Sequence, residues 1–128
     1  MRIFKTRVFN RWAKGLLSDD ILLVSAYQIA AGNFDASLGK KVYKKRIALA
    51  GKGKSGGART IVAYQEGNNI FFVEGFTKDK KDNVTSTEKI ALQNAANVYL
   101  TLSVTALKKA VTENKLIEIK QGQSRGKT

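Results

Sequence analysis

Apolar side chains at helical spacing follow a short β-type segment at the start of the chain. Residues 2–5 carry side chains typical of strands and are expected to form an edge strand. Residues 8–17 predict a first helix with one apolar face, and Gly15 weakens its last turn. This apolar face consists of Phe9, Trp12, Ala13 and Leu16.

A second helix is predicted by capping signals as well as by apolar spacing. Ser18 is a favourable N-cap residue, and Asp19 and Asp20 lie in the first turn, where the helix dipole favours negative charge. Gly32 is expected to end this helix. Its apolar stripe consists of Leu22, Ala26, Ile29 and Ala30.

Strand-like segments fill the middle of the chain. After a polar loop, residues 41–49 alternate between two faces, which predicts a strand. A loop rich in glycine and lysine, residues 51–57, precedes a second strand over residues 59–64. A turn at residues 66–69 leads into a third strand over residues 70–76, so the last two strands are predicted to form a hairpin.

The C-terminal third predicts two helices and a final strand. Thr85 and Glu88 have the spacing of a capping box, which opens a long helix. Ser103 caps a shorter helix over residues 104–112, and residues 116–119 form a possible last strand. The stripe of the long helix consists of Leu92, Ala95, Tyr99 and Leu102.

This order of elements, β-α-α-β-β-β-α-α with a possible final strand, indicates an α+β fold because helices are segregated from a hairpin-built sheet. Large side chains at helical or strand spacing are expected in its core. They are Phe9, Trp12, Phe71, Phe72 and Tyr99.

Composition excludes several kinds of chemistry. The chain has 128 residues, enough for one domain with its own core. It has no cysteine and no histidine, which excludes disulfides, thiol nucleophiles, histidine-dependent catalytic pairs and histidine-ligated metals. No apolar run approaches the roughly 20 residues that span a bilayer. Since the N-terminus also lacks the apolar core of a signal peptide, a cytoplasmic protein with no membrane-spanning segment is expected.

Positive charge is concentrated in the first half of the chain. The formal net charge is +13, and residues 1–65 hold 13 basic and 3 acidic side chains. Such a one-sided stretch repels itself and favours an anionic partner, above all nucleic acid, with an acidic protein or a membrane surface as alternatives. Residues 36–65 have no acidic side chain and eight basic ones, namely Lys40, Lys41, Lys44, Lys45, Arg46, Lys52, Lys54 and Arg59.

The glycine loop matches two nucleotide-binding patterns only superficially. Residues 51–56 fit G-x-G-x-x-G, but a strand is predicted after them, whereas a dinucleotide site needs a helix there. Gly53-Lys54-Ser55 is similar to the end of a P-loop, yet Ala48 stands where the leading glycine would be. No nucleotide site is therefore predicted. The acidic side chains Glu74, Asp79, Asp82 and Glu88 have no metal-ligand spacing and are expected in surface ion pairs or caps.

The same loop suits a phosphodiester. Its glycines let the backbone approach a ligand closely, and Lys52 and Lys54 bring ammonium groups to the same place. Arg46 and Arg59 flank the loop on strands expected to pair, and arginine forks match phosphate oxygens. Lysines 78, 80 and 81 would join this cluster if their turn folds back, and either Phe76 or Tyr64 would offer a ring to a base.

Two functions fit such a cluster. RNA carries its own nucleophile, the 2′-hydroxyl, so a base, an acid and charge stabilisation on the phosphorane suffice for cleavage without histidine or metal. A lysine crowded by like charges has a lowered pKa and suits the role of base. A binding module needs the same basic loop, and the residues by themselves favour binding over catalysis.

Three central segments carry a pattern that is more specific than a single glycine motif. They are Tyr43-Lys44-Lys45-Arg46-Ile47-Ala48, then Gly51-Lys52-Gly53-Lys54-Ser55-Gly56-Gly57-Ala58-Arg59-Thr60, then Phe71-Phe72-Val73-Glu74-Gly75-Phe76-Thr77-Lys78 with Asp82-Asn83 after it. Their order and spacing, with the N-terminal Phe4-Lys5, Phe9 and Trp12, resemble the RelE/HigB-like toxins of type II toxin–antitoxin systems. The resemblance covers roughly residues 1–119.

This resemblance implies a RelE-like α+β toxin domain over residues 1–119, with N-terminal helices beside a small, mostly antiparallel sheet and with C-terminal helices. Residues 120–128 would be a basic flexible tail. The implied activity is that of a ribosome-dependent mRNA endoribonuclease that inhibits translation and needs no metal or cofactor. The implied partners are a cognate antitoxin (a small helix-turn-helix protein), the ribosome with its mRNA, and operator DNA through the antitoxin complex.

The resemblance also assigns roles to individual residues. The implied catalytic residues are Arg46, Lys52, Lys54 and Arg59, and the implied RNA-binding residues are Lys44, Lys45, Phe76, Lys78, Lys80 and Lys81. Many family members stack a C-terminal tyrosine on a base, but this chain has no aromatic residue after Tyr99. Phe76 is the expected substitute.

Other functions stay open at this point. A ParE-like branch shares the fold but poisons DNA gyrase and lacks the basic catalytic set. A non-enzymatic nucleic-acid binder, a co-repressor acting with an antitoxin, and an inactive relic of a mobile element are further alternatives.

Overall fold

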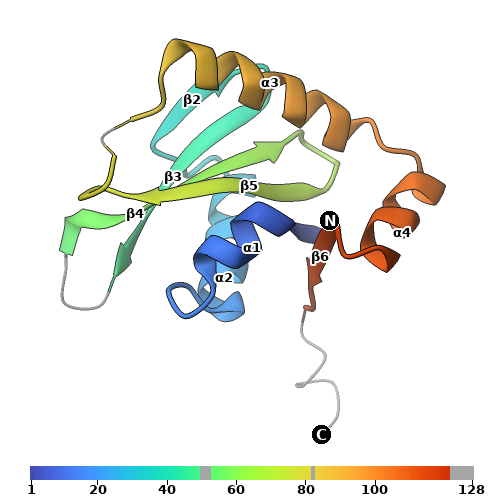
Figure 1. The fold of residues 1–128 in the computed structure, drawn as a ribbon, viewed down its shortest axis with the longest axis horizontal. Helices are drawn as coiled ribbons and strands as arrows, with labels where there is room; N and C mark the ends of the chain where they lie inside the picture. The colour runs from blue at the N-terminus through green and yellow to red at the C-terminus, as the bar shows by residue number, and fades with distance from the viewer. Residues whose placement is uncertain (50–52, 82, 122–128) are drawn as a thin grey trace, which may run out of the picture.

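A computed structural model describes residues 1–49, 53–81 and 83–121, with the backbone alone at residues 53–56. Within these residues ten elements follow one another (Figure 1): β1 (Ile3–Thr6), α1 (Arg7–Ala13), α2 (Asp19–Ala30), β2 (Ala36–Gly39), β3 (Val42–Leu49), β4 (Gly53–Tyr64), β5 (Ile70–Thr77), α3 (Ser86–Leu100), α4 (Val104–Thr112) and β6 (Leu116–Ile119). The predictions for Gly51, Lys52, Asp82 and residues 122–128 lie outside the described residues.

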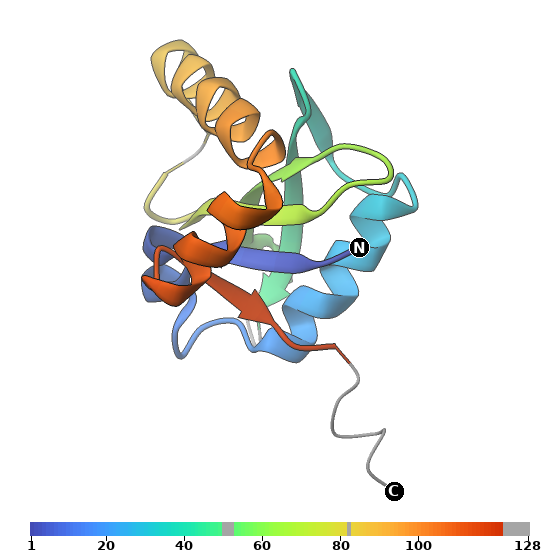
Figure 2. The same ribbon diagram turned by 90° about the vertical axis from the view of Figure 1, so that its right-hand side faces the viewer.

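Six strands of the described chain form one sheet in the order β2-β3-β4-β5-β1-β6. Every neighbouring pair is antiparallel except β1 and β5, so the predicted α+β fold with a mostly antiparallel sheet is confirmed. The prediction that the first strand lies at an edge is wrong. β1 lies between β5 and β6, and Figure 2 shows it beside β6 from the far end of the chain. This long-range pairing explains why all four of its residues are buried.

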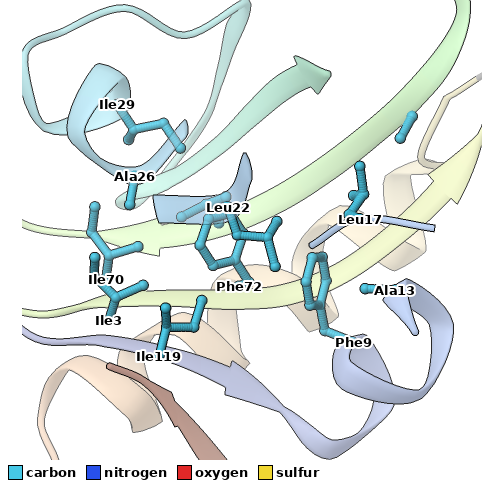
Figure 3. Close-up of a cluster of buried hydrophobic side chains, with 12 residues drawn as sticks. Ile3, Phe9, Ala13, Leu17, Leu22, Ala26, Ile29, Ile70, Phe72 and Ile119 are labelled. Carbon is cyan, nitrogen blue, oxygen red and sulfur yellow. The ribbon is translucent and has the colours of Figure 1, made fainter. Parts of the chain in front are cut away.

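Helices cover both faces of the sheet. In Figure 1, α3 runs above the strands and α1 and α2 lie below them. Since neighbouring side chains on a strand point to opposite faces, Phe72 packs with Phe9 of α1 and Leu22 of α2 (Figure 3). Phe71 packs on the other face with Leu92 of α3. Two cores therefore hold the sheet, one on each face. We call these faces the α1/α2 face and the α3 face.

Local capping signals predicted most helix boundaries correctly. Ser18 accepts a hydrogen bond from Ile21 N at 3.2 Å, and Ser103 accepts one from Ala106 N at 3.0 Å. Thr85 and Glu88 form the predicted capping box. The first helix is shorter than predicted and ends at Ala13, because Gly15 adopts φ +75° and turns the chain.

The central strands differ from the prediction in two places. Residues 36–39, expected in a polar loop, form β2, and residues 53–57, expected in the glycine loop, belong to β4. Both segments have low strand propensity. They are extended because β3 pairs with each of them, with Ala36 opposite Lys44 and Leu49 opposite Gly53. Tertiary pairing thus outweighs propensity.

The predicted apolar stripes hold in part. Leu16 lies beyond the end of α1 and is exposed, and Leu17 is buried instead. Leu22, Ala26 and Ile29 of α2 are buried as expected. In α3, Leu92 and Ala96 are the buried residues, and Leu102 lies beyond the helix end. Of the predicted core aromatics, Phe9, Phe71 and Phe72 are fully buried, whereas Trp12 and Tyr99 are half-buried against the two cores.

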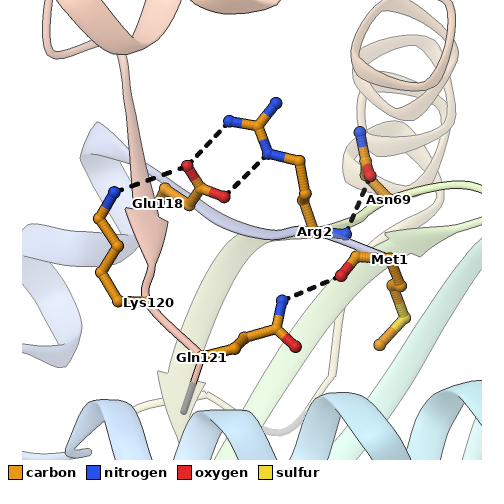
Figure 4. A network of polar contacts seen from close by, with 6 residues as sticks. All are labelled: Met1, Arg2, Asn69, Glu118, Lys120 and Gln121. Atoms are coloured by element: carbon orange, nitrogen blue, oxygen red, sulfur yellow. Dashed lines mark hydrogen bonds and ion pairs between the residues drawn. The ribbon is translucent and has the colours of Figure 1, made fainter. Parts of the chain in front are cut away.

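Polar contacts tie the two ends of the described chain together (Figure 4). The Arg2 guanidinium donates two hydrogen bonds to the Glu118 carboxylate, at 2.9 and 2.8 Å. The backbone N–H of Arg2 donates to Asn69 Oδ1 at 3.0 Å, and Gln121 Nε2 donates to the carbonyl of Met1 at 2.9 Å. No helix in the described part of the chain is long and apolar enough to cross a membrane.

Candidate nucleic-acid interface

Three of the predicted site residues form a row across the middle of the sheet. Arg46 on β3 lies directly opposite Arg59 on β4, and Arg59 lies directly opposite Phe76 on β5. Residues directly opposite each other share a face. Phe76 belongs to the core beneath α3, so both arginines lie on the α3 face.

The two arginines differ in exposure. Arg46 is exposed, and its backbone N–H donates to the carboxylate of Asp35 at 2.6 Å, which fixes the edge of β3 at this point. Arg59 is 6% exposed, and its Nη1 donates to the carbonyl of Gly57 at 3.2 Å. Arg46 is therefore open to a ligand, whereas Arg59 is held against its own strand.

Gly57 lets β3 and β4 approach closely beside this row. A Cβ atom at residue 57 would lie 2.5 Å from the carbonyl oxygen of Ile47. The carbonyl of Gly57 also accepts a hydrogen bond from Lys78 N at 3.3 Å. The glycine thus links the backbone of β4 to the start of the lysine-rich turn as well as to Arg59.

The pair of lysines at residues 44 and 45 is split between the two faces. Lys44 lies on the α3 face, two residues before Arg46, and its Nζ is 3.5 Å from Asn83 Oδ1. Lys45 lies on the α1/α2 face, opposite Thr60, and is 8% exposed. We call Arg46 and Arg59 the arginine row. Lys44 lies on the same face of the sheet as this row, and Lys45 lies on the opposite face.

The turn after β5 folds back beside the row, which is the arrangement in which its lysines would join the cluster. The backbone N–H groups of Lys80 and Lys81 both donate to the carbonyl of Thr77, at 3.0 and 3.1 Å. Lys78 and Lys80 are exposed. The ammonium group of Lys81 lies 5.6 Å from the centroid of the Phe76 ring and forms an ion pair with Glu88.

Glu88 has a strongly polar environment at the start of α3. The hydrogen bond from Lys81 holds the pKa of the Glu88 carboxyl below its ordinary value, and the bond from the backbone N–H of Thr85 adds to this effect. Glu88 is thus an anion at neutral pH within a cluster of cationic side chains.

The predicted stacking role of Phe76 does not agree with its position. Phe76 is 9% exposed and packs in the core beneath α3, with Lys81 over its ring. Tyr64, the other aromatic considered, packs against the core of the α1/α2 face at the other end of β4. In this structure neither ring offers an open face to a base beside the arginine row.

The side chains of the other two predicted catalytic residues, Lys52 and Lys54, are not among those that the structure describes. Lys52 lies outside the described residues. Lys54 belongs to β4, but its side chain is outside them. The sequence analysis gave no role to two residues that touch the cluster, Asp35 and Asn83, because each meets its arginine or lysine partner only through the pairing of distant segments.

Chemically, this face presents guanidinium and ammonium donors to an anion. The described residues contain no group of three or more metal-ligating side chains. Arginine and lysine side chains converging on one surface suit phosphate oxygens. We call the set of Lys44, Arg46, Arg59, Lys78, Lys80 and Lys81 the basic cluster.

Comparison with known proteins identifies the family of the chain. No curated protein sequence matches the chain. Residues 1–119 match the sequence model of a family described as the RelE toxin of the RelE/RelB toxin–antitoxin system. The match covers every helix and strand of the structure. With its α+β fold and its basic cluster on the sheet, this chain belongs to the RelE toxin family.

Proposed function

We propose that this toxin is a ribosome-dependent endoribonuclease that cuts mRNA and so inhibits translation. The observation that carries the proposal is the arginine row, in which Arg46 and Arg59 lie side by side on one face of the sheet. The lysines of the basic cluster surround it. Family membership supports the same activity, since RelE toxins are generally endoribonucleases.

The proposed reaction uses the 2′-hydroxyl of RNA as nucleophile. The 2′-oxygen attacks the adjacent phosphorus, the bond to the 5′-oxygen breaks, and a 2′,3′-cyclic phosphate results. A base takes the proton of the 2′-hydroxyl, and an acid protonates the departing 5′-oxygen. We assign stabilisation of the phosphorane charge to Arg46 and Arg59, and the proton transfers to Lys52 and Lys54.

The remaining lysines of the cluster would bind the RNA backbone. Lys44, Lys78 and Lys80 supply mobile point charges, which suit phosphates along an extended strand. Arg46 is exposed and would meet the phosphate first. Arg59 is buried in the RNA-free protein, so it reaches the scissile phosphate only after neighbouring side chains move aside.

The partners follow from the same proposal. We infer a cognate antitoxin of the helix-turn-helix type, contact with operator DNA through the antitoxin complex, and action in the cytoplasm. We also infer that residues 1–119 form one toxin domain and that the basic residues after it add nonspecific affinity for RNA. A ParE-like action on DNA gyrase and RNA binding without cleavage are the competing functions.

Primer extension on a single mRNA in a purified translation reaction tests the proposal. New 5′ ends are expected only when both the protein and translating ribosomes are present. Arg46→Ala and Arg59→Ala should each reduce cleavage about a hundredfold or more, the order observed when one charge-stabilising donor is removed. Arg11→Ala is the matched control, because Arg11 is an exposed arginine of α1 and should leave cleavage unchanged.

The other outcomes separate the alternatives. Cleavage without ribosomes would keep the nuclease and exclude the ribosome-dependent mechanism. Intact mRNA together with gyrase-linked DNA breaks on expression would identify the ParE-like activity. Intact mRNA with tight, salt-sensitive RNA binding would identify a non-enzymatic binder.

A further inference from the structure

One lysine of the basic cluster already has an anionic partner within the protein. Lys81 forms an ion pair with Glu88, and the side chains are 34% and 38% exposed, respectively. The pair is therefore open to solvent and to a ligand. Its ammonium also lies over Phe76, at 5.6 Å from the ring centroid, next to the arginine row.

The carboxylate of Glu88 is fixed in place by a second contact. Its Oε1 accepts a hydrogen bond from the backbone N–H of Thr85 at 2.7 Å, while Thr85 Oγ1 accepts one from Glu88 N at 3.1 Å. Only Oε2 contacts Lys81. The capping box thus holds a negative charge at the start of α3, independently of Lys81.

The segment around this pair faces the rest of the basic cluster. Lys44 reaches from β3 to Asn83 Oδ1, two residues beyond Lys81. Lys78 and Lys80 are exposed on the same turn. An RNA strand lying along Lys44 and this turn would bring a phosphate into competition with the Glu88 carboxylate for Lys81.

We propose that Glu88 occupies, in the RNA-free toxin, the place beside Lys81 that an RNA phosphate takes in the complex. Glu88 is a positioning residue, because it acts on RNA through Lys81. Binding of a phosphate exchanges one ion pair for another, so the internal carboxylate lowers the affinity for RNA. This inference rests on the proposed RNA substrate.

Replacing Glu88 by glutamine separates the two roles of the carboxylate. The amide oxygen of Gln still accepts the bond from Thr85 N, since glutamine also serves in capping boxes. The negative charge that competes for Lys81 is lost. Glu113→Gln is the matched control, because Glu113 pairs with the exposed Lys115 at the end of α4, and its loss changes the net charge equally.

Binding of a fluorescein-labelled 12-nucleotide oligouridylate to the full chain, measured by anisotropy at several KCl concentrations, tests the inference. Glu88→Gln should bind about two- to fivefold more tightly than the wild type at low salt, the range expected for one exposed ion pair. The gain should shrink as salt rises. Glu113→Gln should show a much smaller gain. In a Lys81→Ala background, Glu88→Gln should have no effect.

Each remaining outcome decides against the inference. Equal gains for Glu88→Gln and Glu113→Gln would show a general charge effect. A gain that persists with Lys81→Ala, or no binding by any variant, would also overturn it. Cleavage of mRNA by the wild-type protein tests the proposed nuclease separately. If the wild type does not cleave mRNA but the variants show the expected binding pattern, the nuclease is excluded and the exchange at Lys81 is still supported. Thermal unfolding of each variant shows whether it remains folded.

Discussion

At the scale of single residues, the two arginines of the row differ in how much they contribute to the stability of the fold. Arg59 is buried and donates to the carbonyl of Gly57, whereas the side chain of Arg46 is exposed. Both are basic residues on neighbouring strands, and no sequence pattern distinguishes them. Their environments therefore predict different effects on stability from the same substitution.

We expect Arg59→Ala to lower the free energy of unfolding by about 1–3 kcal/mol, because a buried hydrogen-bonded side chain is removed and its partner loses a donor. Arg46→Ala should change it by less than about 0.5 kcal/mol, as is usual for an exposed side chain. Urea denaturation of both variants measures the difference. Equal losses would mean that Arg46 also supports the fold.

This difference affects how cleavage by the two variants is interpreted. A folded Arg46→Ala protein without activity assigns a direct chemical role to Arg46. Loss of activity by Arg59→Ala carries the same meaning only if the variant is folded at the assay temperature, so the two measurements belong together.

At the scale of elements, α1 rests on the sheet at a glycine. A Cβ atom at residue 75 would lie 2.1 Å from Trp12 Cζ3, so the indole ring lies directly on the backbone of β5. Gly75 is directly opposite Thr60 and next to Phe76. β5 therefore packs against α1 on one face, and on its other face Phe76 lies next to Arg59.

Gly75→Ala should destabilise the protein by about 1–3 kcal/mol, the usual cost of overpacking a well-packed contact. Trp12→Leu should recover part of this loss in the double variant, because a smaller side chain leaves room for the new methyl group. Thermal unfolding of the two single variants and the double variant measures the coupling. Strictly additive losses would show that the ring is not the obstacle.

At the scale of the whole molecule, charge and chain ends are both arranged by the sheet. Sequence-distant cations gather on the α3 face because β3, β4 and β5 are neighbours. The Arg2–Glu118 pair connects the first strand to the last, and the hydrogen bond from Arg2 lowers the pKa of the Glu118 carboxyl. Because of this pair, the free energy of unfolding depends on pH.

A carboxyl whose pKa is lowered in the folded state stabilises the fold above its unfolded pKa. That contribution disappears as the pH falls through the folded value. We therefore expect the free energy of unfolding to decrease as the pH is lowered from about 5 toward 3. Glu118→Gln should make this decrease shallower. It should lower the free energy of unfolding at pH 7 by only about 1 kcal/mol, because solvent weakens the ion pair at the half-exposed Arg2 side chain.

Denaturant titrations at several pH values measure this effect. Glu66→Gln, in the exposed turn between β4 and β5, is a control for the loss of a single carboxylate. If Glu118→Gln and Glu66→Gln have the same pH dependence, the bidentate pair with Arg2 does not contribute to acid stability.

The sequence alone determined the features whose signals are local. The caps at Ser18, Thr85 and Ser103 predicted helix starts correctly, because a capping residue and its N–H partner are three residues apart. Alternation predicted the strand over residues 41–49, and the same alternation puts Lys44 and Arg46 on one face of it. Absence of histidine and cysteine and the excess of basic residues limited the chemistry before any fold was known.

Tertiary structure alone decided the features that depend on pairing between distant segments. β1 is an inner strand only because β6 joins it, and glycine-rich residues 53–57 are extended only because β3 lies beside them. Burial of Phe76 and the contact between Lys81 and Glu88 likewise arise from packing. No residue within a few positions carries a signal for them, because their free energy comes from contacts across the sheet.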